Sequence, residues 1–490
     1  MDEAIVKHTK MLVVGSGGNA IALAVSLIRA GYSDLGIITK HHDFGGAWLQ
    51  NTYPGCEVDC KSAAYQFSFD LNADWSALYA TQPELKNYLQ KVARDGGLYE
   101  RTIFNCAMTN ARWDETRAHW IVGTTCGSMA ADHLLLATGF LEEAVTPDLP
   151  GFDSFRGASF HSSRWPAGYT GKGERIAVLG SGSSAAQIVP AMQETADHVY
   201  QFQRTPTWML PKGNRALSAE EKQALRSDPA ELQKQRDEVI EMQETAWNDV
   251  FVGSNSAFYL EISQKFLADE VPDPVLRAHL TPDHALGCKR PVISDNYYRS
   301  LGNPNVTLVP EGVTRIEDGR LVTASGREFE VDTIVLATGF YFGGHILDLV
   351  QRRDGQSVGS FQAGHPRAYK AISVAGCPNL YLVGGPAPNG QIWNGLYPGE
   401  GVAAYVIRVM EYLQAHDLRA VEVTHEAEIA WKAATDEILD KSPVVAGGCV
   451  NYAQDSKGHN KATWPGNLAS MTMAMSHFEA SDYHAIRGLP

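Results

Sequence analysis

The sequence predicts an α/β fold of two Rossmann-like units, the second inserted into the first. Two observations lead to this prediction. A glycine-rich turn, Gly15–Ala20, lies between an apolar run at 11–14 and a helix-like segment. A second such turn, Gly180–Ala185, comes 165 positions later, between an apolar run at 175–179 and another helix-like segment. Strand, glycine turn and helix in this order form a dinucleotide-binding unit, so two copies predict two dinucleotide sites.

Length and charge narrow the class of protein. A chain of 490 residues is long enough for two or three domains, and 44% hydrophobic residues suit a globular protein. The formal net charge of −15 argues against a nucleic-acid surface and against attraction to anionic membranes. The chain has no apolar stretch near the roughly 20 residues of a membrane-spanning helix, and its acidic start lacks a secretory pattern. We therefore expect a cytoplasmic protein.

The seven cysteines are scattered singly, without a CxxC pair, and their number is odd. This usage fits a reducing compartment better than a disulfide framework. We expect each cysteine to be a small, buried, apolar residue with a free thiol.

The other elements of the first unit follow from apolar runs and turn residues. We expect a second strand, an amphipathic helix opened by Pro83, two short strands, and an apolar strand that ends in Ala-Thr-Gly. In chain order these segments are 34–38, 83–95, 103–106, 120–125 and 132–139.

A segment rich in proline and glycine, 146–172, predicts a linker to the second unit. That unit continues with a strand at 198–203 and a charged helical segment at 218–277. A second strand that ends in Ala-Thr-Gly, 332–339, is expected to return to the first sheet, and a helix at 400–414 is expected to close the first domain.

These elements predict the domain limits. The first domain is discontinuous and covers 1–145 and 330–490. The second domain covers 146–329 and includes a helical insertion at about 216–285.

Each residue of a dinucleotide turn has its own physical task. Gly15 permits the tight turn, Gly17 lets a pyrophosphate approach the backbone, and Ala20 is small enough for close helix–strand packing. Free N–H groups at the helix start favour phosphate. The candidates in the second turn are Gly180, Gly182 and Ser183.

Two longer segments resemble the fingerprints of type I Baeyer–Villiger monooxygenases, which are class B flavoprotein monooxygenases. Gly45–Asp59 matches GGxWxxxxYPGxxxD throughout, and Phe155–Pro166 matches FxGxxxHxxxWP throughout. The resemblance extends from Met11 to about Gly466. It implies FAD in the first domain, NADPH in the second, and a ketone and O2 as substrates. It further implies that a C4a-peroxyflavin inserts one oxygen atom beside the ketone carbonyl and yields an ester or lactone.

The first fingerprint supplies candidate FAD contacts. Gly46 lets the backbone approach a flat cofactor, and Trp48 offers an apolar face to cover it. Asp59 follows a Tyr-Pro-Gly turn and can face the isoalloxazine; a turn-capping carboxylate is the alternative. The resemblance implies that Tyr65 contacts the flavin; a core aromatic is the alternative.

The candidate catalytic residue is Arg290, in the run Gly287–Pro291, where similar family members read G-x-K-R-P. By resemblance, its guanidinium stabilises the negative charge that develops during oxygen transfer. Asp59 would pair with Arg290 and hold its orientation. Lys289 would reach the phosphate of NADP. A surface Lys-Arg pair is the alternative.

Arg204 and Thr205 follow the strand at 198–203 in a Gln-Arg-Thr-Pro run. They are candidates for the ribose 2′-phosphate of NADP, because an NAD site would carry an acid there. His161 and Trp165, in the second fingerprint, are expected at a hinge between the domains. For His161 a hydrogen-bonded hinge role is favoured over proton donation.

One position departs from the family pattern. Flavin-binding units usually end their second strand with Glu or Asp, which binds the adenosine ribose, but this chain has Thr39 there. A hydroxyl makes no charge-assisted hydrogen bond, so we expect weaker FAD binding, by about 1–3 kcal/mol. The following Lys40 leaves open a phosphorylated ribose in the first site.

Several alternatives stay open at this stage. The chain could oxygenate nitrogen or sulfur, or oxidise NADPH without oxygen transfer, or be a flavin-poor binding protein. Trp393 and Tyr397 could line the substrate pocket or pack in the core. The sequence does not identify the ketone, the regiochemistry or the oligomeric state.

Overall fold

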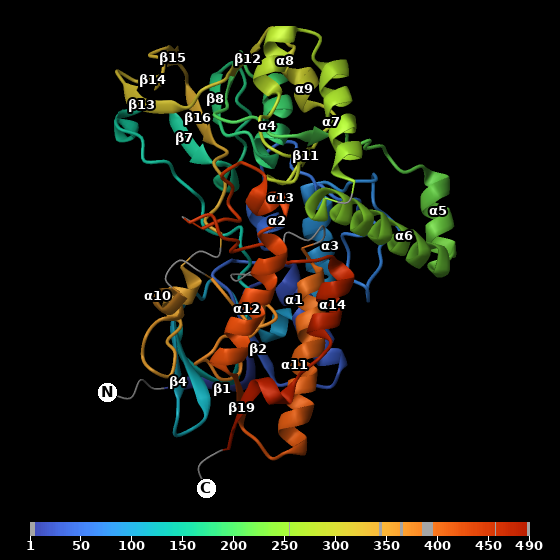
Figure 1. Cartoon of the computed structure of the whole chain (residues 1–490), viewed down its shortest axis with the longest axis vertical. Helices are drawn as coiled ribbons and strands as arrows, with labels where there is room; N and C mark the ends of the chain where they lie inside the picture. The colour runs from blue at the N-terminus through green and yellow to red at the C-terminus, as the bar shows by residue number, and fades with distance from the viewer. Residues whose placement is uncertain are drawn as a thin grey trace.

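The computed structural model describes residues 5–253, 255–342, 345–362, 366–384, 395–455 and 457–487. Its two main sheets lie towards opposite ends of the long axis (Figure 1). Helices α11, α12 and α14, from the last part of the chain, lie along the first unit, whereas α5 and α6 project to one side (Figure 1). In the described part of the chain, every helix is too short or too polar to cross a bilayer.

The first sheet carries the first glycine turn. Its strand order is β3-β2-β1-β6-β5-β4, and β17 also pairs with β6. The pairs β1–β2, β1–β6 and β6–β17 are parallel, whereas β4, β5 and β6 form an antiparallel meander. The bounds are β1 Ile5–Val14, β2 Leu35–Ile38, β3 Thr102–Ile103, β4 Met108–Asp114, β5 His119–Thr124, β6 Gly127–Leu136 and β17 Leu380–Leu382.

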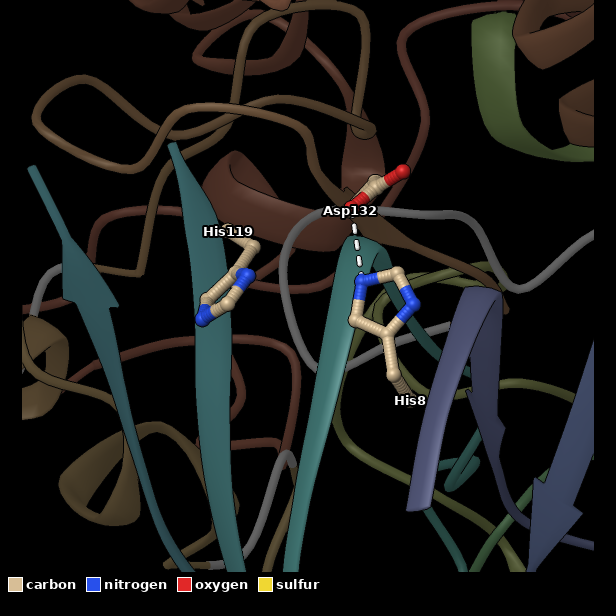
Figure 2. A group of neighbouring side chains, drawn as sticks. All are labelled: His8, His119 and Asp132. Atoms are coloured by element: carbon tan, nitrogen blue, oxygen red, sulfur yellow. Dashed lines mark hydrogen bonds and ion pairs between the residues drawn. The ribbon is translucent and has the colours of Figure 1, made fainter. Parts of the chain in front are cut away.

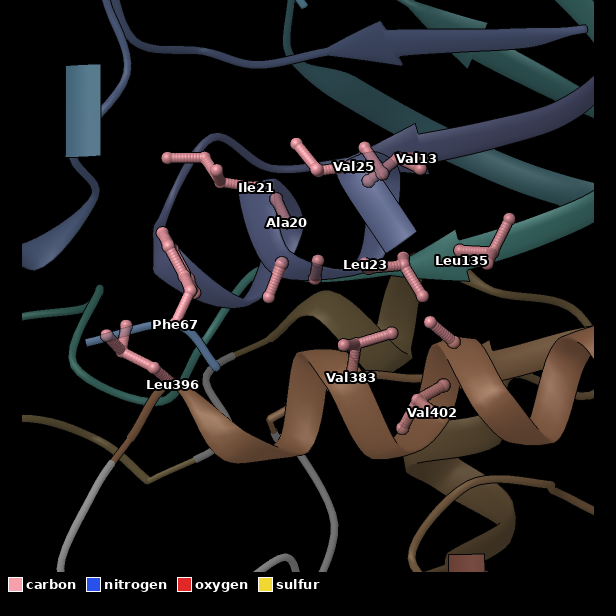
Figure 3. Close-up of a cluster of buried hydrophobic side chains, with 14 of the residues drawn as sticks. Val13, Ala20, Ile21, Leu23, Val25, Phe67, Leu135, Val383, Leu396 and Val402 are labelled. Carbon is pink, nitrogen blue, oxygen red and sulfur yellow. The ribbon is translucent and has the colours of Figure 1, made fainter. Parts of the chain in front are cut away.

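Helix α1 (Gly18–Arg29) is packed between this sheet and helix α11 (Tyr397–Ala415). Figure 3 shows Leu23 of α1 between strand residues such as Leu135 and helix residues such as Val402. The helices approach closely because α11 has a glycine at the crossing: a Cβ on Gly399 would lie 2.5 Å from the carbonyl oxygen of Asn19. This packing fixes the start of α1, where the dinucleotide turn lies.

The helix predicted at 83–95 is confirmed as α3 (Gln82–Asp95). It begins with a capping box formed by Thr81 and Glu84, and Pro83 occupies its first turn. A short helix, α2 (Ala47–Gln50), lies inside the first fingerprint.

The second sheet carries the second glycine turn. Its strand order is β12-β9-β8-β16-β7, and all pairs are parallel. The bounds are β7 Ala158–His161, β8 Arg175–Leu179, β9 His198–Phe202, β12 Val306–Val309 and β16 Thr333–Leu336. Helix α4 (Ser183–Gln193) follows the turn.

The expectation that the strand at 332–339 returns to the first sheet is wrong. Ile334 of β16 pairs with Ala177 of β8 and Ser159 of β7, so β16 is a central strand of the second sheet. The chain returns to the first sheet later, at β17. The predicted linker at 146–172 also contributes the edge strand β7. We therefore propose that the second domain extends through β16, beyond the expected limit at 329.

The segment predicted as a helical insertion consists of α5 (Ala219–Ser227), α6 (Pro229–Trp247), α7 (Ser256–Glu270) and α8 (Pro274–Leu280). The remaining helices are α9 (Tyr297–Leu301), α10 (Val358–Gln362), α12 (His425–Leu439), α13 (Pro443–Ala446) and α14 (Leu468–Met475). The remaining strands are β10 (Met209–Leu210), β11 (Val292–Ile293), β13 (Val313–Glu317), β14 (Arg320–Thr323), β15 (Glu328–Glu330), β18 (Ala420–Val423) and β19 (Tyr483–Ile486).

Candidate active site

The first glycine turn presents bare backbone at the start of α1. Gly15 has φ of +128°, and a Cβ there would lie 2.2 Å from the carbonyl oxygen of Ala137. Gly17 is the N-cap of α1, and among the described residues no side chain caps the helix. Ala20 is fully buried where α1 meets its neighbours. The first N–H groups of the helix are therefore available to a phosphate.

The first fingerprint folds back onto this turn. Gly46 has φ of +54°, and a Cβ there would lie 2.6 Å from Gly17 Cα. The N–H of Gly45 donates to the carbonyl oxygen of Ser16 at 2.9 Å. Two glycine motifs thus form one backbone surface, and among the described residues a Cβ on Gly17 would meet no side chain within 4 Å. This surface fits the pyrophosphate of a dinucleotide.

Trp48 and Tyr65, both candidates for FAD contacts, touch each other. The indole N–H of Trp48 donates to the Tyr65 hydroxyl at 2.9 Å, and the rings meet edge to face with centroids 5.6 Å apart. Burial raises the pKa of Tyr65, although the bond from Trp48 acts in the opposite direction. The phenol is therefore a neutral group that the indole orients.

Asp59 and Arg290 form an ion pair between the two units. Arg290 Nη2 lies 2.9 Å from Asp59 Oδ2, and the two side chains are 29% and 28% exposed. Burial alone would lower the pKa of Arg290, but the charges of Asp59, Tyr452 and Cys60, with the hydrogen bond to Asp59, together outweigh burial and raise the pKa. The pair therefore holds a permanent cation in a fixed orientation.

The Tyr-Pro-Gly turn explains how Asp59 reaches Arg290. The Tyr53 hydroxyl donates to Gln187 Oε1 of α4 at 2.9 Å, and Gln187 Nε2 donates to the Glu57 carbonyl oxygen at 2.9 Å. A Cβ on Gly55 would lie 2.8 Å from the Gln187 carbonyl oxygen. The first fingerprint is thus docked on the helix that follows the second glycine turn.

The second glycine turn repeats the geometry of the first. Gly180 has φ of +132°, and a Cβ there would lie 2.1 Å from the Ala337 carbonyl oxygen. Gly182 is the N-cap of α4, and among the described residues no side chain caps the helix and no atom lies within 4 Å of the Cβ position of Gly182. Ser183, the first residue of α4, is exposed. This open helix start fits the pyrophosphate of a second dinucleotide.

Among the predicted NADP contacts, Thr205 lies beside this turn, and Arg204 and Lys289 lie within electrostatic reach of each other. The Ser181 hydroxyl donates to the Thr205 carbonyl oxygen at 2.9 Å. Burial lowers the pKa of Lys289 and the charge of Arg204 lowers it further, while Asp283 acts in the opposite direction. Two neighbouring cations repel each other, so the arrangement favours an anion between Arg204 and Lys289.

His161 and Trp165 lie where the chain crosses between the units. His161 Nδ1 accepts the N–H of Ser163 at 3.1 Å, so its Nε2 carries the proton and donates to the Gly339 carbonyl oxygen at 3.0 Å. That carbonyl also accepts the N–H of Val145 at 2.9 Å, and both chain crossings therefore meet at Gly339. Burial lowers the pKa of His161. Trp165 donates to the Tyr169 carbonyl oxygen at 3.1 Å. The hinge role stays a prediction.

At the end of β2, the hydroxyl of Thr39 forms hydrogen bonds to other protein groups. Thr39 is 2% exposed; its Oγ1 lies 2.9 Å from Ser16 Oγ and accepts the N–H of His41 at 3.2 Å. The residue therefore supports the glycine turn, and the carboxylate usual at this position is absent.

Sequence reasoning missed Glu142, whose carboxylate contacts the loop that follows Thr39. It lies 2.6 Å from Lys40 Nζ and 3.2 Å from His41 Nε2, and it accepts a bond from Gln50 Nε2 at 2.8 Å. Burial opposes its charge, but the bonds from His41 and Lys40 lower the pKa of Glu142 to about 2. Its position, three residues beyond the Ala-Thr-Gly strand, was the available signal, because ligands bind at the carboxyl ends of parallel strands.

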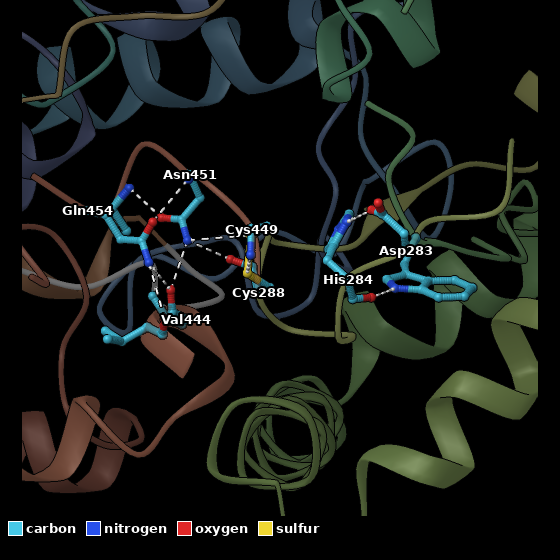
Figure 4. Close-up of a disulfide and its surroundings, with 10 residues drawn as sticks. Asp283, His284, Cys288, Val444, Cys449, Asn451 and Gln454 are labelled. Carbon is cyan, nitrogen blue, oxygen red and sulfur yellow. Dashed lines mark hydrogen bonds and ion pairs between the residues drawn. A yellow bond between two sulfur atoms is a disulfide. The ribbon is translucent and has the colours of Figure 1, made fainter. Parts of the chain in front are cut away.

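Cys288 and Cys449 form a disulfide, so the expectation that all cysteines are free is wrong. The bond joins the residue before Lys289 to the segment after α13. Asn451 Nδ2 reinforces it by donating to the carbonyl oxygens of Cys288 at 2.8 Å and Val444 at 2.9 Å (Figure 4). Cysteine spacing could not reveal a partner 161 positions away. The other five cysteines are free; four of them are buried as expected, but Cys126 is exposed, so the expectation is wrong for that residue.

A cavity beside the disulfide is lined by Lys289, Arg290, Phe251 and Tyr452, among others. It adjoins the candidate catalytic arginine. Tyr397 begins α11, with the Arg236 guanidinium 5.3 Å from its ring centroid. Trp393, the other candidate for the pocket wall, lies outside the described residues.

Known proteins resemble this chain over nearly its whole length. The family described as flavin-binding monooxygenase-like matches residues 56–217. A Baeyer–Villiger monooxygenase of Streptomyces coelicolor is 32% identical over 100% of this chain and 95% of its own length. A Baeyer–Villiger monooxygenase of Pseudomonas aeruginosa is 33% identical over 98% of this chain and 92% of its own.

Solved structures of monooxygenases also superpose on this chain over nearly its whole length. Cyclohexanone monooxygenase from Rhodococcus sp. Phi1, bound to NADP+, superposes with a TM-score of 0.87 and 25% identity, covering 98% of this chain and 100% of the other. A complex of OTEMO with FAD and NADP gives a TM-score of 0.85 and 26% identity, covering 97% and 99%. With two relatives above 30% identity over nearly full length, the chain belongs to the Baeyer–Villiger monooxygenase family.

Proposed function

We propose that this protein is an FAD- and NADPH-dependent Baeyer–Villiger monooxygenase. It inserts one oxygen atom of O2 next to the carbonyl of a small-molecule ketone and releases an ester or lactone. The observation that carries the proposal is the ion pair of Arg290 and Asp59, which joins the two units. The protein acts in the cytoplasm, without a membrane or nucleic-acid partner.

Arg290 is the catalytic residue. Its guanidinium stays charged and faces the junction of the two units, where it stabilises negative charge on the reacting oxygen and on the ketone oxygen. Asp59 positions the guanidinium through the 2.9 Å contact. Bound FAD supplies the oxygen chemistry after reduction by NADPH, and the protein residues bind, orient and shield it from water.

The remaining residues divide between the two cofactors. Gly15, Gly17, Gly46, Trp48 and Tyr65 hold FAD, with Ala20 and Thr39 supporting the turn. The second site holds NADP: Gly180, Gly182 and Ser183 take its pyrophosphate, whereas Arg204, Thr205 and Lys289 take its 2′-phosphate. Two glycine turns with open helix starts support this division.

The test is product analysis with isotopic oxygen. Purified holoprotein is incubated with NADPH, labelled O2 and a panel of cyclic, linear and aromatic ketones, and products are identified by mass spectrometry. We expect an ester or lactone that carries one labelled oxygen atom. NADPH consumption that yields only hydrogen peroxide, or labelling only of amines or sulfides added as competitors, would overturn the proposal. Protein that purifies folded but without bound flavin would overturn it as well.

A further inference from the structure

Three side chains that commonly bind metal ions meet on the first sheet, far from both glycine turns. His8 lies on β1, His119 on β5 and Asp132 on β6, and Figure 2 shows them side by side on one face. One ligand atom from each lies within 4.8 Å of the other two. We propose that these residues form a binding site for one divalent transition-metal ion of the zinc, cobalt or nickel type.

The strand register brings the three residues together. His8 pairs with Ala130 across β1 and β6, so Asp132 lies one step further along on the same face. Trp120 pairs with Ala131 across β5 and β6, which puts His119 beside Asp132. Because neighbouring strands lie about 4.8 Å apart, three side chains on one face can reach a single ion.

The distances suit a tetrahedral site. His8 Nε2 lies 3.0 Å from Asp132 Oδ1. With metal–ligand bonds of about 2.1 Å, two ligand atoms of a tetrahedral ion lie about 3.4 Å apart. The His8–Asp132 pair is already near that separation. The His119 ligand atom has to move closer by no more than about 1.4 Å, which side-chain torsions provide.

His119 is not committed to another partner through its Nε2 atom. The residue is only 8% exposed, and within the described part of the chain Nε2 has no hydrogen-bond partner. A buried imidazole nitrogen without a partner costs free energy, so no hydrogen bond at Nε2 opposes a rotation of the His119 ring about its side-chain torsions towards an ion. His119 therefore has the freedom that a metal ligand needs.

The neighbouring residues determine how many ligands the protein supplies to the metal ion. Asp114 lies opposite His119 on β4. Its Oδ2 accepts from Arg117 Nη1 at 3.0 Å, and its Oδ1 accepts the N–H groups of Thr116 and Arg117. Asp114 thus contributes negative charge but no free oxygen. The protein supplies two imidazole nitrogens and one carboxylate, and water completes a tetrahedral shell.

This donor set selects the class of ion. Two nitrogens suit zinc, cobalt and nickel, whereas magnesium and calcium prefer oxygen ligands only. His8 precedes Gly15 by seven residues of extended chain, which is about 23 Å. The ion would therefore clamp β1, β5 and β6 together and take no part in oxygen transfer.

The experiment is metal binding by tag-free holoprotein that has been treated with a chelator and dialysed. Zn2+ binding is measured by equilibrium dialysis with elemental analysis, and Co2+ by visible absorption at wavelengths beyond the flavin bands. We expect one equivalent of Zn2+ at micromolar free concentration, with a four-coordinate cobalt spectrum. His8→Ala and Asp132→Asn should each lower the affinity by about tenfold or more.

A matched control is His345→Ala. His345 is also exposed and lies near two carboxylates, at 3.1 Å from Glu143 and 3.2 Å from Asp348, but through different ring nitrogens. This substitution should leave the affinity unchanged. His119→Ala tests the buried ligand; if that variant does not fold, His8→Ala decides, because His8 is exposed. Equal binding by wild type and His8→Ala, or no binding at micromolar Zn2+, would overturn the proposal.

Discussion

Asp59 Oδ2 lies 2.9 Å from Arg290 Nη2, although the two residues are 231 positions apart in the sequence. Asp59 belongs to the fingerprint that packs on the first glycine turn, and Arg290 belongs to the second unit, next to Lys289. The ion pair therefore forms only when the two units are packed together. Substitutions at this pair should separate cofactor binding from oxygen transfer.

Arg290→Ala should reduce ester formation by at least about 100-fold, the usual effect of removing a group that stabilises developing charge. The FAD content and the anaerobic reduction of flavin by NADPH should stay close to wild type, because the glycine turns are untouched. Asp59→Asn keeps the cation but loses its charged partner, so a smaller loss of about tenfold is expected.

Product yield, flavin absorbance and stopped-flow reduction measure these effects separately. Arg299→Ala is the control, because Arg299 also pairs with a carboxylate, Glu270, at 3.2 Å, but at the exposed surface. Ester formation that survives in Arg290→Ala would refute the assignment of the catalytic residue.

Gly17→Ala should weaken FAD binding by about tenfold while the protein still folds. The φ of Gly17 is −80°, and the nearest atom to an added Cβ would be Gly46 Cα at 3.6 Å, an ordinary contact. The added methyl group would instead occupy the surface that a pyrophosphate needs. A loss of about 1.4 kcal/mol corresponds to this factor, and flavin fluorescence during dilution measures it.

Gly182→Ala is the matched variant at the second turn. Its φ is −85°, and an added Cβ would have no neighbour within 4 Å in the described part of the chain. The KM for NADPH should rise about tenfold with normal FAD content, the reverse of the pattern for Gly17→Ala. If both variants lost FAD and neither changed the KM for NADPH, the assignment of the two sites would be wrong.

The local sequence pattern predicted the two units because strand, glycine turn and helix are adjacent in sequence. The prediction failed where a structural feature depends on residues that are far apart in the sequence. Nothing local to 332–339 distinguishes the sheet in which β16 lies, since an apolar strand pairs equally well in either. For the same reason, the sequence did not predict the Cys288–Cys449 disulfide or the ion pair of Glu142 with Lys40. Asp59 and Arg290 could be paired in advance only through the family fingerprints.

Arg204→Ala should shift the coenzyme preference from NADPH towards NADH by about 10–100-fold. A guanidinium beside the second strand of a dinucleotide unit binds the 2′-phosphate, which NADH lacks. The KM for NADPH should rise, and the KM for NADH should stay nearly constant. Arg164→Ala, an exposed arginine of the second fingerprint region, serves as control. Equal effects on both coenzymes would contradict the role.

Glu142→Gln should lower stability at neutral pH by about 1–3 kcal/mol, because the carboxylate pairs with Lys40 and His41. The pKa of Glu142 is lowered from 4.5 to about 2, so the folded state favours its charged form. The stabilisation is therefore complete above pH 4.5 and is lost as the pH falls towards 2.

Urea unfolding of both proteins across this pH range measures the difference. Glu143→Gln is the neighbouring control, since Glu143 pairs with the exposed His345. FAD affinity should fall in Glu142→Gln as well if the carboxylate organises the ribose end of the site. A stability difference that grows at acidic pH would contradict this account.

Cys449→Ala should lower the melting temperature and increase the share of NADPH that is consumed without product. The disulfide closes a loop of 161 positions, for which the chain-entropy argument gives at most about 5 kcal/mol. It also fastens the segment with Asn451 and Tyr452 to the residue two positions before Arg290. Without the bond, this wall of the cavity loosens and admits water, so reduced flavin reacts with O2 without oxygen transfer.

Melting followed by flavin fluorescence and the ratio of peroxide to ester test both effects. A dithiol reductant should reproduce them in wild type but not change the variant further. Cys126→Ala, which removes an exposed free thiol, should behave as wild type. Unchanged melting and an unchanged ratio in Cys449→Ala would show that the hydrogen bonds of Asn451 alone hold this segment in place.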